Sequence, residues 1–507
     1  MNKIETRTKK SARNALSGMI SQIISILLSF VSRTVFIHFL SVDYLGVEGL
    51  FSNVLTILSL SELGIGGAIA YAMYRPMKEQ NHDKVRQLVD FYHKAYKIIG
   101  FIIAIIGFIL SFFIQSIISS KPNITENLQL IFGLFLLNNI CSYFVAEKQT
   151  ILIVNQDKFI DSYVKQACQV LRFVFQLVFL YTTRSYYAYL IIQVLFTLFN
   201  NISLAVIVNK KYPWITNKRE GELSQLEKKS IFKDVKALAI SKIAGVISSG
   251  ADNIIVTKLF GLGLVGVMSN YNLVITAVNG VIWQGINNLV GNIGNFNSNA
   301  DLASRRKIFD EVWVVTYWAY TFSCACLFIL LTPFINLWLG GNYTVNQAVV
   351  SVLIANMFAG GIVFPMYSFR ITSGIFDSVK WYYVISGIVN IVLSIFLGKI
   401  FGLFGIYLAT ILSRVLISDM AEAYYVNKEI LLLPFSHYIF RIIGSSMLTV
   451  IISVVVKKII SFIPGDGVLT FAAKTFSSVA LINAFLFLLF YRTDAFKRLK
   501  ERIIRLF

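Results

Sequence analysis

Long apolar runs alternate with short polar segments over almost the whole chain. A run of about 20 apolar residues is the length that a helix needs to cross the ~30 Å hydrocarbon core of a bilayer. The pattern predicts fourteen such helices, which makes the chain an all-α polytopic membrane protein. The predicted spans are roughly 15–40, 47–73, 98–119, 127–153, 163–182, 186–208, 236–258, 264–292, 311–335, 346–371, 381–399, 403–425, 438–460 and 469–491.

Composition and charge support this interpretation. The 507 residues are 56% hydrophobic and only 14% charged, whereas about 25% of a soluble domain is charged. The net charge of +20 would suggest nucleic acid in a soluble protein. In a membrane protein it indicates the positive-inside bias, so no nucleic-acid partner is expected. The first apolar run exceeds the ~7–15 residues of a signal-peptide core and is predicted to be a retained helix.

Lys and Arg are distributed unevenly over the two sides of the membrane. If the N-terminus is cytoplasmic, the cytoplasmic segments hold most of the 46 Lys and Arg residues. The richest segments are 1–14, 75–97, 209–236 and 492–507. The outer turns hold only Lys121, Arg184, Lys258, Lys399, Lys457 and Lys458. We therefore expect both termini to be cytoplasmic. Segments 78–97 and 492–507 are predicted to form amphipathic helices on the inner surface.

The longest polar segment divides the chain into two similar halves. We predict an N-terminal lobe at 1–215 (helices 1–6), a cytoplasmic linker at 216–235, a C-terminal lobe at 236–435 (helices 7–12), and helices 13–14 with a basic tail at 436–507. Leu45-Gly46-Val47 aligns with Val265-Gly266-Val267 after the first helix of each lobe. Since six helices return the chain to its starting side, the repeats are parallel, and a site is expected between them near the midplane.

Motifs of catalysis and cofactor binding are missing from the sequence. There is no GxxxxGK[ST] loop for ATP, and the GxGxxG match at Gly261–Gly266 lies in an outer turn without a preceding strand. The four His do not cluster, and the four Cys lack metal-ligand spacing. We predict no catalytic residue, no metal and no organic cofactor, and hence not an enzyme. A membrane glycosyltransferase or polymerase would need a large outer loop, and the outer turns are short.

Charges inside the predicted spans are the candidates for a functional site. A charged side chain at the bilayer centre costs about 2.5–3.5 kcal/mol on insertion scales, so such residues usually face a cavity or a partner. The candidates for binding an anionic substrate such as a diphosphate are Arg33, Arg172, Lys242 and Arg414. Pairing with an opposite charge, or snorkelling to the interface, is the alternative. It is the favoured interpretation for Lys242, Asp419 and Lys474.

The acidic residues Glu62 and Asp252 are candidates for coupling or gating. Arg33 and Glu62 differ in height by roughly 9 Å at 1.5 Å per residue, so a direct pair would need both side chains extended. If they are unpaired, Arg33 is available to a substrate and Glu62 to a coupling proton or sodium ion. Gly66, in the glycine-rich stretch after Glu62, is either a bend that lets the helix move or a site of close helix packing.

Two segments resemble a known family. YLGVEGLF at 44–51 and SELGIGGAIAYAMYRPM at 61–77, with Tyr96 and Asn200-Asn201, resemble the polysaccharide-transporter (Wzx-like flippase) branch of the multidrug/oligosaccharidyl-lipid/polysaccharide flippase superfamily. The resemblance implies two six-helix lobes around a central cavity, a further helix pair, and alternating access. It implies translocation of undecaprenyl-diphosphate-linked oligosaccharide repeat units across a bacterial cytoplasmic (inner) membrane, for capsule, exopolysaccharide or O-antigen synthesis. The implied partners are that glycan lipid, the bilayer, and a polysaccharide polymerase with other assembly proteins.

Two functions of the same fold stay open as alternatives. One is a lipid II flippase, and relatives of that type carry a lipid groove near their last two helices, which implies a similar role for helices 13–14. The other is a cation-coupled multidrug exporter. An exporter of cationic drugs should present an acidic cavity, whereas the buried cations outnumber the buried anions among the residues selected above.

Overall fold

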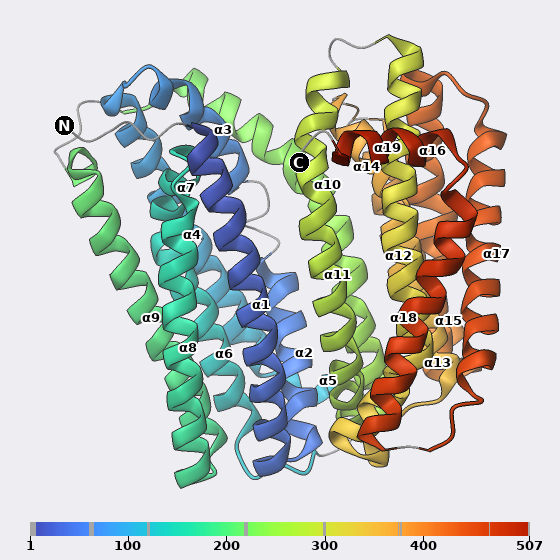
Figure 1. Ribbon diagram of the computed structural model, residues 1–507. Coiled ribbons are helices and arrows are strands. Elements are labelled where there is room, and N and C mark those ends of the chain that lie inside the picture. Colours follow the sequence, from blue (N-terminus) through green and yellow to red (C-terminus); the bar gives the residue numbers. More distant parts are fainter. Residues whose placement is uncertain are drawn as a thin grey trace. The chain divides into compact units, whose positions relative to one another are not determined.

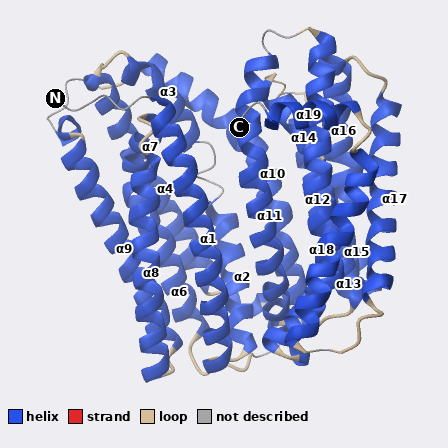
Figure 2. Ribbon diagram, viewed as in Figure 1, coloured by secondary structure: helices blue, strands red, loops and turns tan. Residues whose placement is uncertain are grey.

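The structure is a computed structural model that describes residues 7–59, 65–118, 122–216, 222–297, 301–373, 375, 378–465 and 467–504. Every regular element in these residues is a helix (Figure 2). Contacts divide the chain into two compact units, Met1–Gly266 (unit 1) and Val267–Phe507 (unit 2). The boundary falls inside one helix, α11 (Leu262–Asn297). The predicted lobe boundary at the 216–235 linker stays a prediction.

Unit 1 consists of helices of very different lengths (Figure 1). They are α1 (Arg7–Phe39), α2 (Val42–Leu58), α3 (Ile65–Lys78), α4 (His82–Ser111), α5 (Ile114–Ile117), α6 (Leu128–Ser142), the 3-10 turn η2 (Tyr143–Val145), α7 (Ala146–Val154), α8 (Lys158–Thr183), α9 (Tyr186–Lys211), η3 (Pro213–Thr216) and α10 (Gln225–Phe260).

Unit 2 contains most of α11 and the remaining helices (Figure 1). They are α12 (Leu302–Leu339), η4 (Gly341–Tyr343), α13 (Gln347–Ile362), α14 (Phe364–Thr372), α15 (Lys380–Ser413), the π-helical η5 (Arg414–Asp419), α16 (Met420–Val426), η6 (Asn427–Leu431), α17 (Phe435–Ile460), α18 (Val468–Phe490) and α19 (Asp494–Ile504).

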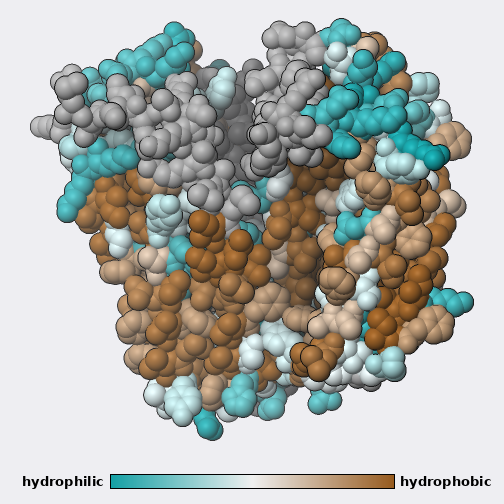
Figure 3. All heavy atoms as spheres, in the orientation of Figure 1, coloured by the Kyte–Doolittle hydropathy of each residue, from teal (hydrophilic) through white to brown (hydrophobic). Residues whose placement is uncertain are grey.

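Each of the fourteen predicted spans falls on one or more helices of the described residues. The span predicted at 47–73 is divided between α2 and α3. The spans at 381–399 and 403–425 belong to α15 and to η5 and α16, which continue it. Helix α15 bends between these two spans at Gly402, whose φ is +63. Ten stretches of the described residues are long and apolar enough to cross a membrane, one of them Lys380–Leu431 with both of these spans. On the face in view, apolar side chains occupy the middle of each unit and hydrophilic ones gather toward its ends (Figure 3). The chain is an all-α polytopic membrane protein.

The core of unit 1 is built from apolar and aromatic side chains of α1, α2, α4, α6 and α9. The ring of Phe51 in α2 lies edge-on to Phe132 and Phe135 of α6 at centroid distances of 5.2 and 5.9 Å. At the start of α10, Ser224 and Glu227 form a capping box. Glu227 also pairs with Lys84 of α4, and this hydrogen-bonded ion pair lowers the pKa of the Glu227 carboxyl. Helix α10 is therefore tied to unit 1 from its first turn.

Two glycines of the internal repeat bring α2 and the first turn of α11 into backbone contact. A Cβ on Gly46 would lie 2.2 Å from the carbonyl oxygen of Leu262, and a Cβ on Gly266 would lie 2.3 Å from that of Val42. Gly46 therefore faces Leu262, which is four residues before Gly266. In the same way, Gly266 faces Val42, which is four residues before Gly46. This reciprocal arrangement is what two related turns crossing about a local two-fold axis produce. Only glycine permits so close an approach, because any Cβ would overlap the opposing backbone.

Helix α12 is the central element of unit 2 and packs against α13, α17, α18 and α19. Trp318 of α12 stacks on Phe496 of α19 at 5.8 Å. Arg498 of α19 donates to the buried Glu311 of α12 at 2.9 Å. The predicted amphipathic tail helix is thus present as α19, which runs across the end of unit 2 where α16 lies (Figure 1).

Gly46→Ala is expected to destabilise the protein by about 1–3 kcal/mol, the range for overpacked sites. The added methyl would overlap the Leu262 carbonyl and force α2 away from α11. The measurement is thermal unfolding of the purified protein in detergent. Gly133→Ala in α6 is the matched control, because a Cβ there meets no atom within 4 Å. Equal unfolding temperatures for the two variants would contradict the close contact.

Candidate functional site

Two of the predicted cations come together in unit 1. Arg33 lies on α1 and Arg172 on α8, and these helices pack against each other. The charges of both, with that of Glu48 from α2, act on the hydroxyl of Tyr189 in α9. All four residues are at least partly buried. The two arginines thus lie in one cluster with Glu48 and Tyr189.

This cluster has hydrogen-bonding capacity for an anion. Arg172 Nε is buried and has no hydrogen-bond partner among the described residues. A guanidinium presents five N–H donors in a fixed plane, suited to the paired oxygens of a phosphate or carboxylate. Glu48 was not selected from the sequence, although it stands inside the predicted span 47–73. A charge inside a predicted span was the signal that could have identified it.

The structure describes only some of the other unit 1 residues that the sequence offered as candidates. Glu62 lies outside the described residues, and Lys242 lies on α10 with its side chain outside them. Asp252 is buried on α10, with 8% of its surface exposed. Gly66 lies in the first turn of α3, where a Cβ would come within 2.8 Å of the Tyr92 hydroxyl of α4. Gly66 therefore allows close packing of α3 on α4, and its role as a bend stays a prediction.

Arg414 and Asp419 face each other at the two ends of the π-helical segment η5 in unit 2. Arg414 Nε lies 3.5 Å from Asp419 Oδ2, and Arg414 Nη2 donates to the Asn356 carbonyl at 2.8 Å. The guanidinium rests against Gly360 of α13, where a Cβ would lie 2.9 Å from Nη1. The Arg414 side chain is 31% exposed and that of Asp419 8%. Arg414, a predicted substrate-binding cation, is thus partly neutralised by the carboxylate of Asp419.

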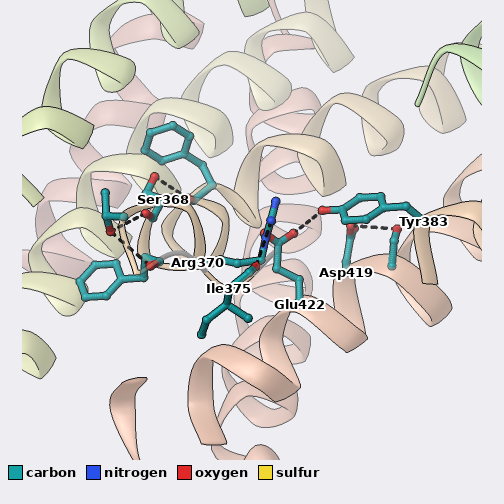
Figure 4. A network of polar contacts seen from close by, with 10 residues as sticks. Ser368, Arg370, Ile375, Tyr383, Asp419 and Glu422 are labelled. Carbon is teal, nitrogen blue, oxygen red and sulfur yellow. Dashed lines mark hydrogen bonds and ion pairs between the residues drawn. The ribbon is translucent and has the colours of Figure 1, made fainter. Parts of the chain in front are cut away.

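A second ion pair of unit 2 is more deeply buried (Figure 4). Arg370 Nε donates to Glu422 Oε1 at 2.6 Å, and the Tyr383 hydroxyl donates to Glu422 Oε2 at 2.8 Å. The side chains of Arg370 and Glu422 are 8% and 1% exposed. Arg370 Nη1 also donates to the Ile375 carbonyl at 3.3 Å. This network joins α14, α15 and α16.

Burial of a charged pair is costly unless its hydrogen bonds are satisfied. Here the Arg370 guanidinium also lies 5.5 Å from the Tyr367 ring centroid and 5.9 Å from that of Tyr383. These contacts account for the pair as a structural element of unit 2. Neither Arg370 nor Glu422 was selected as a candidate from the sequence, although they lie inside the predicted spans 346–371 and 403–425.

An apolar cavity of about 530 Å³, here called the slot, runs through unit 2 beside α17. Its walls come from α12, α13, α15, η5 and α17, and the α17 wall extends from Tyr438 to Val454. At 1.5 Å per residue these positions are about 24 Å apart. Asp419 is the one charged residue among the described residues that line it.

Three hydroxyls of the slot bond back to their own helices. Thr449 Oγ1 donates to the Ser445 carbonyl at 2.9 Å, Ser453 Oγ to that of Thr449 at 2.7 Å, and Ser351 Oγ to that of Gln347 at 2.8 Å. Their donors are therefore satisfied locally, and the walls present mainly hydrocarbon. The slot suits a long apolar chain. Within the described part of the chain, no group of three or more His, Cys, Asp and Glu is placed to hold a metal ion.

The family model described as "Polysaccharide biosynthesis protein" matches residues 11–286. No curated protein matches the sequence. The chain is similar in structure to "Lipid II flippase MurJ, inward closed conformation", with TM-score 0.70 and 13% identity over 94% of this chain and 98% of that one.

Two MATE transporter structures are also similar, and the first is described as a multidrug resistance transporter. An inward-facing MATE family transporter of the MOP superfamily has TM-score 0.63 and 13% identity over 81% of this chain and 97% of that one. The Vibrio cholerae MATE transporter VcmN has TM-score 0.55 and 12% identity over 84% and 99%. At these identities the likeness shows the fold, which is that of polytopic membrane transporters.

Glu422→Gln is expected to destabilise the protein by about 3–5 kcal/mol, because it leaves the buried Arg370 without a compensating charge. The measurement is thermal and denaturant unfolding in detergent. Glu79→Gln is the control, since the Arg75–Glu79 pair of 2.8 Å is exposed and such pairs contribute under about 1 kcal/mol. A similar, small effect of both substitutions would mean that the Arg370 charge is compensated elsewhere.

Proposed function

The chain belongs to the polysaccharide biosynthesis protein family of MOP-superfamily flippases, and we propose that it translocates polyprenyl-diphosphate-linked oligosaccharide repeat units across the bacterial cytoplasmic membrane by alternating access. Both termini are then cytoplasmic, and the exported units feed capsule, exopolysaccharide or O-antigen assembly. The observation that carries this proposal is the slot in unit 2, an apolar cavity whose α17 wall extends over about 24 Å of the ~30 Å of a bilayer core.

The slot fits the hydrocarbon part of such a substrate. A polyprenyl chain has no polar group, so its transfer from lipid to protein needs a wall without unsatisfied donors. The back-bonded hydroxyls of Ser351, Thr449 and Ser453 meet this condition. The extended face of α17 provides the length.

The arginine cluster of unit 1 fits the charged part. The diphosphate is the common anionic feature of these lipids, and Arg33 with Arg172 would bind its oxygens through charge-assisted hydrogen bonds. Glu48 keeps the cluster from holding the anion too tightly for release. Lys242 and Arg414 stay candidates from the sequence, and Arg414 would have to exchange Asp419 for the substrate.

Lipid II flipping is the second candidate function. The likeness to the structure titled "Lipid II flippase MurJ" favours it, and lipid II also combines a polyprenyl chain with a diphosphate. Multidrug export fits the arginine cluster less well, because cationic drugs are repelled by two arginines. For either flippase, Glu62 and Asp252 are our proposed sites of proton or sodium coupling, and a polysaccharide polymerase is the proposed partner.

The first test is translocation of a polyprenyl-diphosphate-linked oligosaccharide by the full chain in proteoliposomes. Arg33→Gln with Arg172→Gln should lower the transport rate at least about tenfold, as expected for the loss of charged hydrogen bonds of about 1.5–3 kcal/mol each. Arg184→Gln, at an exposed helix end, is the control and should transport normally. Transport by the double variant at the unaltered rate would refute the role of the cluster.

A second test fills the slot. Ala355→Phe introduces a large side chain into its wall, and we expect transport to fall severalfold while the protein still folds. The control is Ala480→Phe on α18, at an exposed position that does not line the slot. The readout is the transport rate at equal amounts of inserted protein. Equal rates for both variants would exclude the slot as the site of the lipid chain.

A further inference from the structure

A second cavity, of about 400 Å³, lies at the end of unit 2 opposite to α19, and we call it the head-group pocket. Its lining includes Thr332, Asn336, Thr344, Gly465, Phe471 and Lys474. Helix α12 connects the two ends, because its residue Glu311 pairs with α19 and its residue Asn336 lines the pocket. At 1.5 Å per residue these two positions are about 37 Å apart. The head-group pocket is therefore at the opposite membrane surface from the basic tail.

Lys474 is the charged group among the described residues of the pocket. Its Nζ donates to the carbonyl of Gly465 at 3.0 Å. An ammonium group has three donors, so a single carbonyl leaves capacity for a ligand. Gly465 has φ +99, a conformation suited to glycine, and this turn aims its carbonyl at Lys474. The contact orients the ammonium group without neutralising it.

The rest of the lining is mixed in character. Asn336, Thr332 and Thr344 provide amide and hydroxyl groups. Phe471 provides a flat apolar wall, and its ring lies 6.1 Å from that of Phe334. A cation surrounded by neutral hydrogen-bonding groups and one aromatic ring suits a phosphate that carries further polar substituents. The pocket differs in this respect from the apolar slot.

The slot and the head-group pocket follow each other along α12. Phe328 lines the slot and Thr332 lines the pocket. Residues four apart lie on the same face of a helix, one turn from each other. A further cation lies at this junction, because Lys457 Nζ is 4.6 Å from the ring centroid of Phe328. The order along the helix is thus apolar cavity, junction, and polar cationic pocket.

We propose that the head-group pocket binds the phosphate of an amphiphile whose hydrocarbon chain lies in the slot. The identification of this amphiphile as a translocated polyprenyl-diphosphate glycan rests on the proposed function. With cytoplasmic termini, the pocket opens at the outer surface, and it holds the head group after translocation and before release. A phospholipid head group has the same phosphate chemistry and is the other source of such a ligand.

The binding test uses the full chain in phosphatidylcholine nanodiscs, with farnesyl diphosphate as the probe and farnesol as its uncharged analogue. Lys474→Gln should weaken farnesyl diphosphate binding about tenfold, the effect of one lost charged hydrogen bond, and should leave farnesol binding unchanged. Lys474→Arg should retain the affinity. Ala355→Phe, which obstructs the slot, should weaken both probes.

Two controls separate a specific pocket from general surface charge. Lys458→Gln removes an exposed lysine at the same end of unit 2 that does not line the pocket, and it should bind like the unaltered protein. Asp466→Asn removes the carboxylate that follows Gly465 in the sequence and lies outside the described residues. It should leave binding unchanged or tighten it. Unaltered diphosphate affinity of Lys474→Gln, or an equal loss for farnesol, would overturn the proposal.

The ligand sources are distinguished by competition with phosphatidylglycerol added to the nanodiscs. If phosphatidylglycerol competes with farnesyl diphosphate and Lys474→Gln abolishes this competition, phospholipid is an occupant of the pocket. If phosphatidylglycerol does not compete, the occupant is the polyprenyl diphosphate. Both results support a phosphate pocket. A failure of the phosphate-pocket proposal can be distinguished from a failure of the proposed function. Lys474-dependent binding without glycan-lipid translocation rejects the function alone, whereas translocation with binding independent of Lys474 rejects the pocket alone.

Discussion

The contact between α2 and the first turn of α11 is the constraint on which the organisation of the chain depends. Gly46 and Gly266 each admit the backbone of the opposite helix at a distance that no side chain would permit. The boundary between the two compact units follows directly after Gly266. The start of α11 is therefore held by unit 1, while the rest of this helix belongs to unit 2. The two glycines thus attach the first turn of α11 to α2 within unit 1.

Ion pairs join helices to one another in both units. In unit 2, Arg370 is compensated by Glu422, Arg441 by Asp310, and Arg498 by Glu311, so these pairs join helices to one another. In unit 1, Lys211 pairs with the buried Asp157 at 2.7 Å, while Arg33 and Arg172 of neighbouring helices both lie near Glu48 and Tyr189. Arg172 Nε has no hydrogen-bond partner among the described residues, so this group has capacity left for an anion.

An amphiphilic substrate explains why apolar and cationic features occur together. In unit 2, the slot presents mainly hydrocarbon, because three of its hydroxyls bond back to their own helices, and the cationic head-group pocket follows it along α12. Transport of a lipid-linked glycan requires that the chain stay in an apolar environment while the charged head group moves between polar ones. The separation of these surfaces along the protein is what the proposed function needs.

The apolar periodicity alone determined the helical membrane architecture, because lipid requires every spanning segment to satisfy its own backbone hydrogen bonds. The repeat was also readable, since Gly46 and Gly266 occupy matching motifs. Which charges meet was decided by tertiary structure. Arg33 and Arg172 are far apart in the sequence and come together only through the packing of α1 on α8. Glu48, Arg370 and Glu422 stood inside predicted spans, yet their partners depend on helix rotation and tilt. The slot has no sequence signal at all, because an apolar residue that faces a cavity is indistinguishable in the sequence from one that faces lipid or a neighbouring helix.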